Sequence, residues 1–214
     1  YLLHRLRGLG YSVRVFEAGD DVGGTWYWNR YPGARCDVES MQYSYSFSEE
    51  LQQEWDWSER FSAQPEILEY ANHVADRFDL RRGIEFSTTV TAAHFNEESQ
   101  RWTVTTDKGE SLSAQFCVMA TGCISAAQTP EFEGLADYRG TTYHTGNWPH
   151  EEIDFTGKRI AVIGTGSSAI QAIPVLAEQA EHVTVFQRTP NYSLPSRNGP
   201  MTEDYANSWK DNYA

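Results

Sequence analysis

Cysteine is scarce in this sequence, which has three cysteines among 214 residues and no CxxC pair. An odd number of cysteines without paired spacing argues against a disulfide framework and against a structural zinc site. Cys36, Cys117 and Cys123 therefore indicate a reducing, cytoplasmic setting. The sequence also has no apolar run long enough to span a membrane and no recognisable signal peptide.

Basic residues are in the minority as well. Lys and Arg number 17 against 30 for Asp and Glu, which gives a formal net charge of -13. This acidic balance argues against nucleic acid and against anionic membrane surfaces as partners, and its simplest consequence is solubility. Apolar residues make up 40% of the chain and aromatic residues 14%, so we expect a packed core rather than disorder.

The chain lacks an initiator Met and any stop signal at its end. Its first residues, YLLHRL, have the pattern of the middle of a helix, and its last residues, WKDNYA, carry no turn or cap. The final twenty or so residues show no pattern that assigns them to an element. We therefore expect a fragment of a longer protein, cut at both ends.

The chain opens with what resembles the second half of a βαβ nucleotide-binding unit. Leucines recur at helical spacing in the first nine positions, and Gly8 and Gly10 end that helix. A short strand, Ser12–Phe16, follows and ends on Glu17. An acid at this point is typical of a site that binds the ribose of a dinucleotide. The strand and glycine turn that begin such a unit would lie before residue 1.

A helix and a small sheet are predicted in the middle of the chain. Pro65 opens a helix whose apolar positions share one face as far as Phe78. The stretch Glu85–Met119 then alternates between apolar and polar residues and contains a glycine turn. This pattern predicts a small antiparallel meander whose last strand includes Phe116 and Val118.

A complete βαβ unit is predicted near the end of the chain. A clean strand, Arg159–Ile163, leads into Gly164-x-Gly166-x-x-Ala169, a helix and a second strand, Val183–Phe186. The first glycine allows a tight turn, the second lets the backbone approach a pyrophosphate, and the small third residue allows close packing. Amides at the helix N-terminus then hold the phosphates. The strand before the turn and the helix after it are the context that supports this fingerprint.

The residues after the second strand favour NADP over NAD. An NAD site expects an acid there for the ribose hydroxyls. Here the strand is followed by Gln187, Arg188 and Thr189, and a cation in that place suits a 2′-phosphate. The alternative role for Arg188 is a surface salt bridge.

Glycine-rich turns near the first unit favour FAD there. The loop Asp20–Val38 is too irregular for an element and unusually long, and it contains Gly23–Trp26 directly after Glu17. Ala120–Gly122 is a second turn at which the backbone can approach a ligand closely. We therefore predict a partial α/β, Rossmann-like flavoprotein that binds two dinucleotides and carries the antiparallel meander in its FAD domain. NADPH would deliver a hydride and FAD would accept it.

Three stretches resemble one family, the Baeyer–Villiger flavin monooxygenases. Tyr138–His150, YRGTTYHTGNWPH, is similar to the family fingerprint FxGxxxHxxxWP followed by Asp, from which it departs at its first residue (Tyr for Phe) and its last (His for Asp). Gly23–Asp37 looks like the family's flavin-facing loop, and Gly164–Gln171 together with Arg188 and Thr189 is similar to its NADP half. The resemblance covers essentially the whole chain.

The resemblance implies an FAD- and NADPH-dependent enzyme that inserts one oxygen atom of O2 next to a ketone carbonyl. The reaction would proceed through a flavin C4a-peroxide and give an ester or a lactone. A small-molecule ketone and O2 are the expected partners, with no nucleic acid, membrane or protein partner. Asp37 matches the family's catalytic aspartate beside the flavin, where a buried, ionised carboxylate holds an arginine expected beyond residue 214. A simple turn aspartate is the alternative.

The motifs and the resemblance together define the candidate cofactor-binding residues. The candidates for FAD are Glu17, Gly24, Thr25, Trp26, Arg35, Cys36, Asp37, Tyr43, Val90, Thr121 and Gly122. The candidates for NADP are Gly164, Thr165, Gly166, Ser167, Ser168, Gln171, Arg188 and Thr189. His144 and Trp148 belong to the linker, where the resemblance implies a hinge that coordinates domain movement and NADP handling.

The expected domain order is a partial FAD-binding domain at 1–137, a fingerprint linker at 138–150 and a partial NADP-binding domain at 151–214. Two other functions stay open. One is a flavin monooxygenase that oxygenates nitrogen or sulfur, and the other is a nucleotide-binding fragment without turnover. No metal site is expected.

Overall fold

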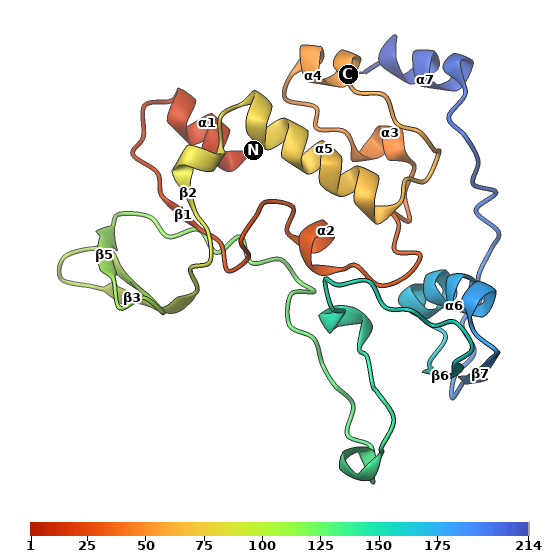
Figure 1. The fold of residues 1–214 in the computed structure, drawn as a ribbon. Helices are drawn as coiled ribbons and strands as arrows, with labels where there is room; N and C mark the ends of the chain where they lie inside the picture. The colour runs from red at the N-terminus through yellow and green to blue at the C-terminus, as the bar shows by residue number, and fades with distance from the viewer. Residues whose placement is uncertain (214) are drawn as a thin grey trace. The chain divides into compact units, whose positions relative to one another are not determined.

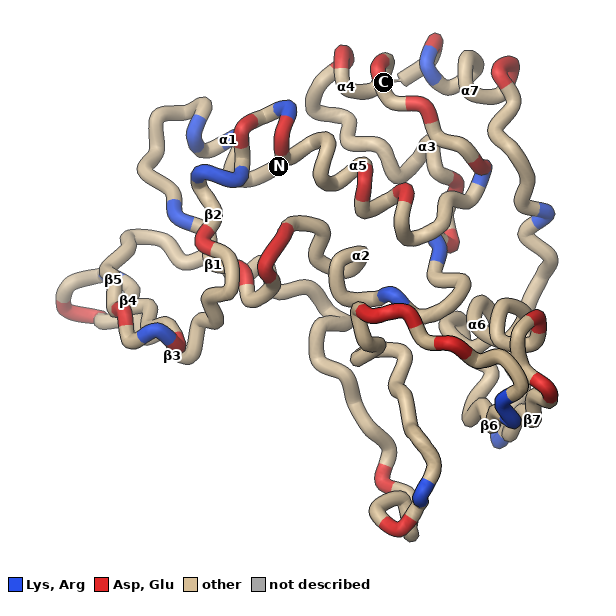
Figure 2. Tube along the Cα trace, in the orientation of Figure 1, with Lys and Arg blue, Asp and Glu red and all other residues tan. Residues whose placement is uncertain are grey.

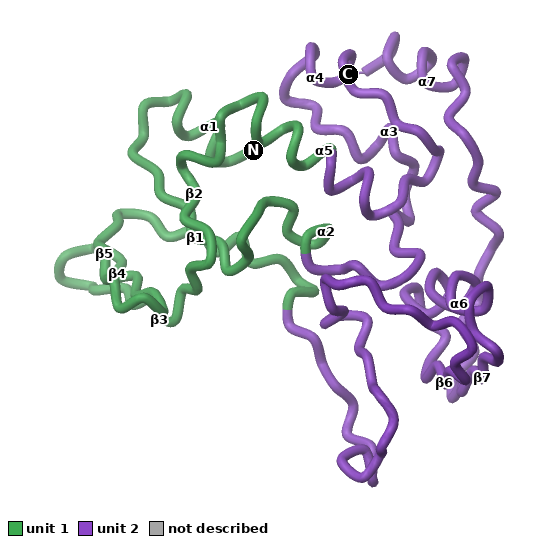
Figure 3. Tube along the Cα trace, in the orientation of Figure 1, with its two compact units in different colours: residues 1–27, 70–125 green, residues 28–69, 126–214 purple. Residues whose placement is uncertain are grey.

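The computed structural model describes residues 1–213 and has an α/β fold with two compact units (Figure 1). Figure 3 colours the first unit, Tyr1–Tyr27 with Tyr70–Ser125, and the second, Trp28–Glu69 with Ala126–Ala214. Each unit contains one pair of parallel strands, and the first also contains an antiparallel sheet. The predicted α/β class with an antiparallel meander is confirmed.

The first unit begins with the predicted helix, α1 (Leu2–Gly8). The strand that follows, β1 (Val15–Phe16), is shorter than the predicted Ser12–Phe16. The reason is its partner, because β2 (Ile84–Glu85) offers only two residues for the parallel ladder. A small core of Leu3, Ala75 and Leu80 lies beneath these elements.

The antiparallel meander consists of β3 (Val90–Asn96), β4 (Arg101–Thr106) and β5 (Ser111–Ala114). The prediction that Phe116 and Val118 belong to its last strand is wrong, because they lie beyond β5 and are 72% and 63% exposed. The ladder between β4 and β5 ends at the pair Trp102 and Ala114, one residue from the start of β4. Residues after Ala114 therefore have almost no β4 backbone left to pair with.

Helix α5 (Gln64–Arg77) confirms the helix predicted at Pro65 and contributes residues to both units. Its buried face includes Ile67, Val74 and Ala75 as expected, and also Tyr70. A 3-10 turn, η1 (Arg81–Gly83), follows it and leads into β2.

Short helices that the sequence pattern did not indicate complete the chain. The loop predicted to be irregular contains α2 (Thr25–Trp28), which begins directly after two glycines with positive φ, 123° and 50°. Helices α3 (Ser40–Tyr43) and α4 (Glu49–Glu54) follow, and α4 is capped by the Ser48 hydroxyl. The unassigned C-terminal stretch forms α7 (Glu203–Lys210), capped by the Thr202 hydroxyl.

Helix α7 lies beside α4 in the second unit (Figure 1). The Lys210 Nζ donates to the Gln53 carbonyl at 2.8 Å, and the Gln53 amide donates to the Lys210 carbonyl at 2.8 Å. These contacts bring together residues more than 150 positions apart. Sequence periodicity carries no signal for such a pairing, whereas the Thr202 cap before Glu203 and Asp204 is a local signal for the helix start.

The second unit contains the predicted βαβ unit with nearly the predicted bounds. Strands β6 (Arg159–Ile163) and β7 (His182–Phe186) are parallel and in register, and α6 (Ser167–Gln179) connects them. Phe155, Ala172 and Leu176 form the core of this unit, with Ile160 and Val162 packed against them. The prediction of this unit from its glycine fingerprint is confirmed.

Acidic residues are distributed along the chain rather than confined to one segment. Figure 2 marks them on α4, α5 and α7, among other places, and helix starts account for several of them. No helix within residues 1–213 is both long and apolar enough to cross a membrane.

Leu51 in α4 is completely buried, with 0% of its surface exposed. Leu51→Ala is expected to lower the free energy of unfolding by about 2–5 kcal/mol, because the surrounding side chains cannot fill the cavity. Leu194 is 93% exposed, so Leu194→Ala is the matched control and should change stability by less than about 0.5 kcal/mol. Urea denaturation of the two variants checks this, and equal shifts would contradict the packing of α4.

Candidate functional site

The turn between β6 and α6 leaves its backbone open. Gly164 has φ +105°, a conformation that favours glycine, and its N–H donates to the Phe186 carbonyl at 2.9 Å. Gly166 lies in extended backbone with φ -73°, and a Cβ added there would meet no atom within 4 Å. The turn is therefore closed by Gly164 and leaves free space over Gly166.

Helix α6 begins without a side-chain cap. Its N-cap is Gly166, and no side chain accepts a hydrogen bond from the first turn. The first backbone N–H groups of a helix have no partner within the helix and carry the positive end of its dipole. Ser167 is exposed and Ser168 half-buried beside these amides. Open backbone, uncapped amides and hydroxyls together fit the pyrophosphate of a dinucleotide.

The residues that follow β7 contact the turn between β6 and α6. The Gln187 and Asn191 side-chain amides both donate to the Thr165 Oγ1, at 2.9 and 3.2 Å. Arg188 and Thr189 are exposed at this end of the sheet. No residue within 1–213 forms an ion pair with Arg188, so the surface salt bridge considered as an alternative is absent from the described part of the chain.

A tight turn of the predicted flavin-facing loop packs against α6. Gly33 has φ +78°, and a Cβ there would clash with the backbone carbonyl of Gln171. The Gln171 side chain then makes four hydrogen bonds to the same loop. Its Oε1 accepts from the Tyr31 hydroxyl at 2.8 Å and from the Arg35 N–H at 3.3 Å. Its Nε2 donates to the Arg35 carbonyl at 3.1 Å and to the Asp37 Oδ1 at 2.9 Å.

The remaining loop residues divide between surface and interior. Asp37 is exposed among the described residues, and its burial beside a flavin and a later arginine stays a prediction. Cys36 is 4% exposed and its thiol contacts the Ser62 carbonyl, and this burial raises the pKa of the thiol. The Arg35 guanidinium pairs with Glu59 at 3.2 Å.

The next acid along the chain, Glu39, anchors the loop. It accepts hydrogen bonds from the Tyr205 hydroxyl and from Arg60, and these two interactions, in that order of size, lower the pKa of its carboxyl. Segment 34–40 also pairs with residues 60–64 through backbone bonds such as Cys36 N–H to Ser62 O at 3.1 Å. The loop that carries Asp37 is therefore held by residues 60–64 and, just after it, by the contact of Glu39 with Tyr205.

The FAD candidates of the first unit include the acid after β1 and two glycines with positive φ. The Glu17 Oε1 accepts from the Gly19 N–H at 2.7 Å. Gly24 has φ +50° and open space where a Cβ would lie. The predicted close-approach turn has Gly122 at φ +73° with Thr121 exposed beside it. A strand-end acid near open glycine backbone fits the ribose and phosphates of a dinucleotide.

Four other candidates occupy separate positions. Thr25 and Trp26 form the start of α2. Val90, at 42% exposure, is no core residue of the meander, and Tyr43 of the second unit is 36% exposed.

The fingerprint segment is irregular apart from a short 3-10 turn, η3 (Thr145–Asn147). The His144 Nδ1 accepts from the Gly146 N–H at 3.1 Å, so this histidine caps the turn. The Tyr138 ring lies where a Cβ on Gly140 would be, which explains the glycine. Trp148 packs against the core of the βαβ unit, 6.1 Å between ring centroids from Phe155. In the described chain these residues stabilise the local structure of the segment, and their contacts do not form a catalytic arrangement.

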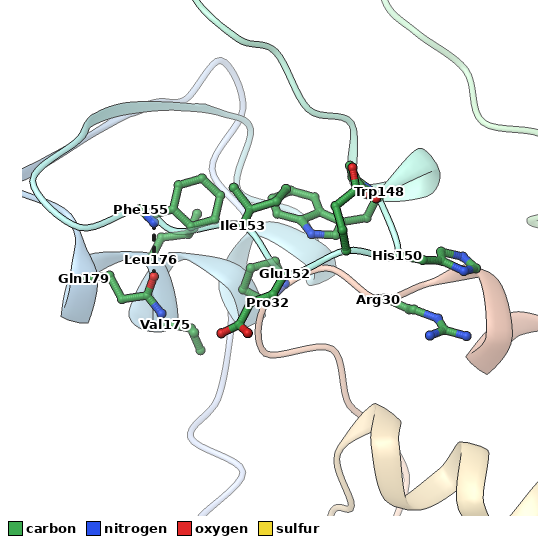
Figure 4. A pocket seen from close by; sticks show the side chains of 12 residues that line it. Arg30, Pro32, Trp148, His150, Glu152, Ile153, Phe155, Val175, Leu176 and Gln179 are labelled. Carbon is green, nitrogen blue, oxygen red and sulfur yellow. Dashed lines mark hydrogen bonds between the residues drawn. The ribbon is translucent and has the colours of Figure 1, made fainter.

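A cavity of about 270 Å³ lies where this segment meets α6 (Figure 4). Trp148 and His150 line it from the segment, Glu152 from the stretch just after it, Arg30 from the loop and Gln179 from α6. The Gln179 Oε1 accepts the Phe155 N–H at 3.4 Å at one side. Among residues 1–213, no cluster of three His, Cys, Asp or Glu side chains could hold a metal ion.

The sequence motifs did not indicate the residues that join the loop to α6. Tyr31 and Gly33 were not candidates, and Gln171 was assigned to NADP although its amide bonds the loop. Pro32-Gly33 is a turn signal that could have indicated the tight approach. The sequence offered no signal for its partner, which lies more than 130 residues away.

Comparisons with known proteins agree with this geometry. The model of the family described as pyridine nucleotide-disulphide oxidoreductase matches residues 36–203, and that of the NAD(P)-binding Rossmann-like domain matches residues 1–56. A Baeyer-Villiger monooxygenase of Pseudooceanicola batsensis is 47% identical over 100% of this chain and 39% of its own length. A phenazine N-monooxygenase of Lysobacter antibioticus is 42% identical over 100% and 39%.

A solved structure, "Oxidized steroid monooxygenase bound to NADP", superposes with a TM-score of 0.94 and 60% identity, covering 100% of this chain and 41% of the other. The chain thus spans about two fifths of the length of the relatives that it matches. The predicted resemblance is confirmed. The chain therefore belongs to the pyridine nucleotide-disulphide oxidoreductase family and is similar over its whole length to Baeyer–Villiger monooxygenases.

Proposed function

We propose that the chain is part of an FAD- and NADPH-dependent monooxygenase that converts a small ketone and O2 into an ester or lactone. The main support for the proposal is that helix α6 carries both the open glycine turn and the side chain that bonds Asp37. Helix α6 begins at the open glycine turn, and one turn later its Gln171 holds Asp37. Helix α6 would thus position both the nucleotide site and the candidate catalytic carboxylate.

NADP would be held by the turn and by the end of β7. Gly164 and Gly166 leave room for the pyrophosphate, while Thr165, Ser167 and Ser168 supply hydroxyls and uncapped amides. Arg188 and Thr189 are exposed at the strand end, where a guanidinium can form a bidentate pair with a 2′-phosphate.

FAD would be held by the candidates of the first unit and of the loop. Glu17 would accept from a ribose hydroxyl, and the backbone at Gly24 and Gly122 would pass close to the phosphates. The remaining candidates are the side chains named above, Thr25, Trp26, Arg35, Cys36, Tyr43, Val90 and Thr121. In this proposal residues 1–137 bind FAD, 138–150 form the linker and 151–214 bind NADP. His144 and Trp148 shape the linker.

Bound FAD and NADPH would supply hydride transfer and the activation of O2. The residues of this chain would bind and orient these groups. Asp37 would hold a cationic side chain near the reacting atoms, since an exposed carboxylate with one oxygen fixed can still pair with a cation. The three cysteines are free thiols, in keeping with a reducing, cytoplasmic setting. The proposal needs no protein partner, nucleic acid or membrane.

Nitrogen oxygenation is the second candidate. The chain is 42% identical to a phenazine N-monooxygenase over its whole length, so the described residues do not separate the two reactions by similarity. A nucleotide-binding module without turnover is the third.

Product analysis separates these candidates. The complete protein, supplied with NADPH, O2 and either cyclohexanone or a tertiary amine, is expected to form a lactone from the ketone. Mass spectrometry with 18O2 should find one labelled oxygen in the product, because one atom of O2 is inserted. An N-oxide with no lactone would favour nitrogen oxygenation, and NADPH consumption without either product would contradict the proposal.

Arg188 should distinguish the two nicotinamide cofactors. Arg188→Ala is expected to raise the Kd for NADPH about 10- to 100-fold and to leave that for NADH within about threefold, because only NADPH carries the 2′-phosphate. Arg159→Ala removes the same charge at the opposite end of the β6–β7 sheet and is the control. Nicotinamide fluorescence titration measures both constants, and an equal loss for both cofactors would contradict the assignment.

A further inference from the structure

The Gln171 side chain forms its hydrogen bonds with the loop that carries Asp37. Both ends of its amide are used, with the oxygen accepting from Tyr31 and the Arg35 N–H and the nitrogen donating to the Arg35 carbonyl and Asp37. All four bonds lie between 2.8 and 3.3 Å. Binding a nucleotide would not by itself require these four hydrogen bonds to the loop.

The bonds to Arg35 fix which way the amide points. The Arg35 N–H needs an acceptor and its carbonyl needs a donor, so the amide oxygen and nitrogen cannot exchange places. The nitrogen is therefore always directed at Asp37. Glutamate has nearly the same shape but only acceptor oxygens, and it would also place a second negative charge beside Asp37.

The Asp37 side chain depends on this contact for its position. It is exposed, and within residues 1–213 its Oδ1 bonds only to Gln171 while its Oδ2 bonds to no residue. A neutral donor fixes one oxygen without cancelling the charge, and the other oxygen stays available to a cation. The backbone on either side of Asp37 is held by the pairing of Cys36 with Ser62 and of Ser40 with Arg60.

We propose that Gln171 is the positioning residue for Asp37, through which α6 sets the place of that carboxylate. The inference rests on the proposed function, in which Asp37 acts at the reacting atoms. Gln171 lies four residues after Ser167, one helical turn along, and therefore on the same face of α6 as the first helical residue after the nucleotide-binding turn. The helix that receives NADP would then also locate the carboxylate needed after flavin reduction.

The test compares Gln171→Glu with Gln179→Glu in the complete protein. Gln179 is the control, because it lies on the same helix and its observed bond uses only Oε1, which glutamate retains. Q171E is expected to lower the rate of ketone oxygenation about 10- to 100-fold at saturating NADPH, with the KM for NADPH and the rate of flavin reduction within about twofold. Q179E should match the wild type in all three.

A double-mutant cycle shows whether the effect passes through Asp37. In an Asp37→Asn background, adding Q171E should cost little further activity, because the group that Gln171 positions is already disabled. A full, additive loss would overturn the proposal, as would a Q171E rate equal to the wild type.

A readout that does not depend on turnover separates this inference from the proposed function. Hydrogen–deuterium exchange of the peptide spanning 31–37 should be about tenfold faster in Q171E than in Q179E, because the loop has lost its donor. If the wild type forms no ester but exchange responds as stated, the proposed function fails and the positioning contact stands. Equal exchange in the two variants overturns the positioning role itself.

Discussion

The second unit depends on a close approach between Gly33 and α6. The turn at Gly33 has φ +78° and packs so tightly on the Gln171 carbonyl that no other residue fits without displacement. This approach brings the Gln171 amide within reach of Tyr31, Arg35 and Asp37. Because the amide bonds both the backbone N–H and the backbone carbonyl of Arg35, hydrogen bonds join the loop directly to the helix. The position of the Asp37 side chain therefore depends on the contact between the loop and the helix rather than on the neighbouring sequence.

The two ends of α6 have different tasks. Its first turn is uncapped and faces the open backbone of Gly166, which leaves amides for an anionic ligand. Its later turns bury Ala172 and Leu176 against Phe155, and Trp148 of the fingerprint packs on the same core. The fingerprint residues thus stabilise the helix that carries the nucleotide turn. This explains how a segment can mark a family while its own histidine does no more in the described chain than cap a 3-10 turn.

Local patterns predicted the βαβ unit, the helix at Pro65 and the meander, because glycine turns, helical periodicity and alternation are properties of neighbouring residues. They failed where distant residues decide the outcome. The β1 strand is short because β2 offers only two partners, and Phe116 and Val118 leave the sheet because β4 has ended. For the same reason the motifs identified Asp37 and Gln171 as separate candidates but could not predict the bond between them.

The variant Gly166→Ala tests most directly whether the open turn before α6 is a nucleotide site. A methyl group at Gly166 meets no protein atom, and φ there is -73°, so the chain itself should tolerate it. The unfolding midpoint should therefore stay within about 2 °C of the wild type, while the Kd for NADPH rises about tenfold or more because the methyl group occupies the space of the pyrophosphate. An unchanged Kd for NADPH in a normally folded G166A protein would contradict the claim.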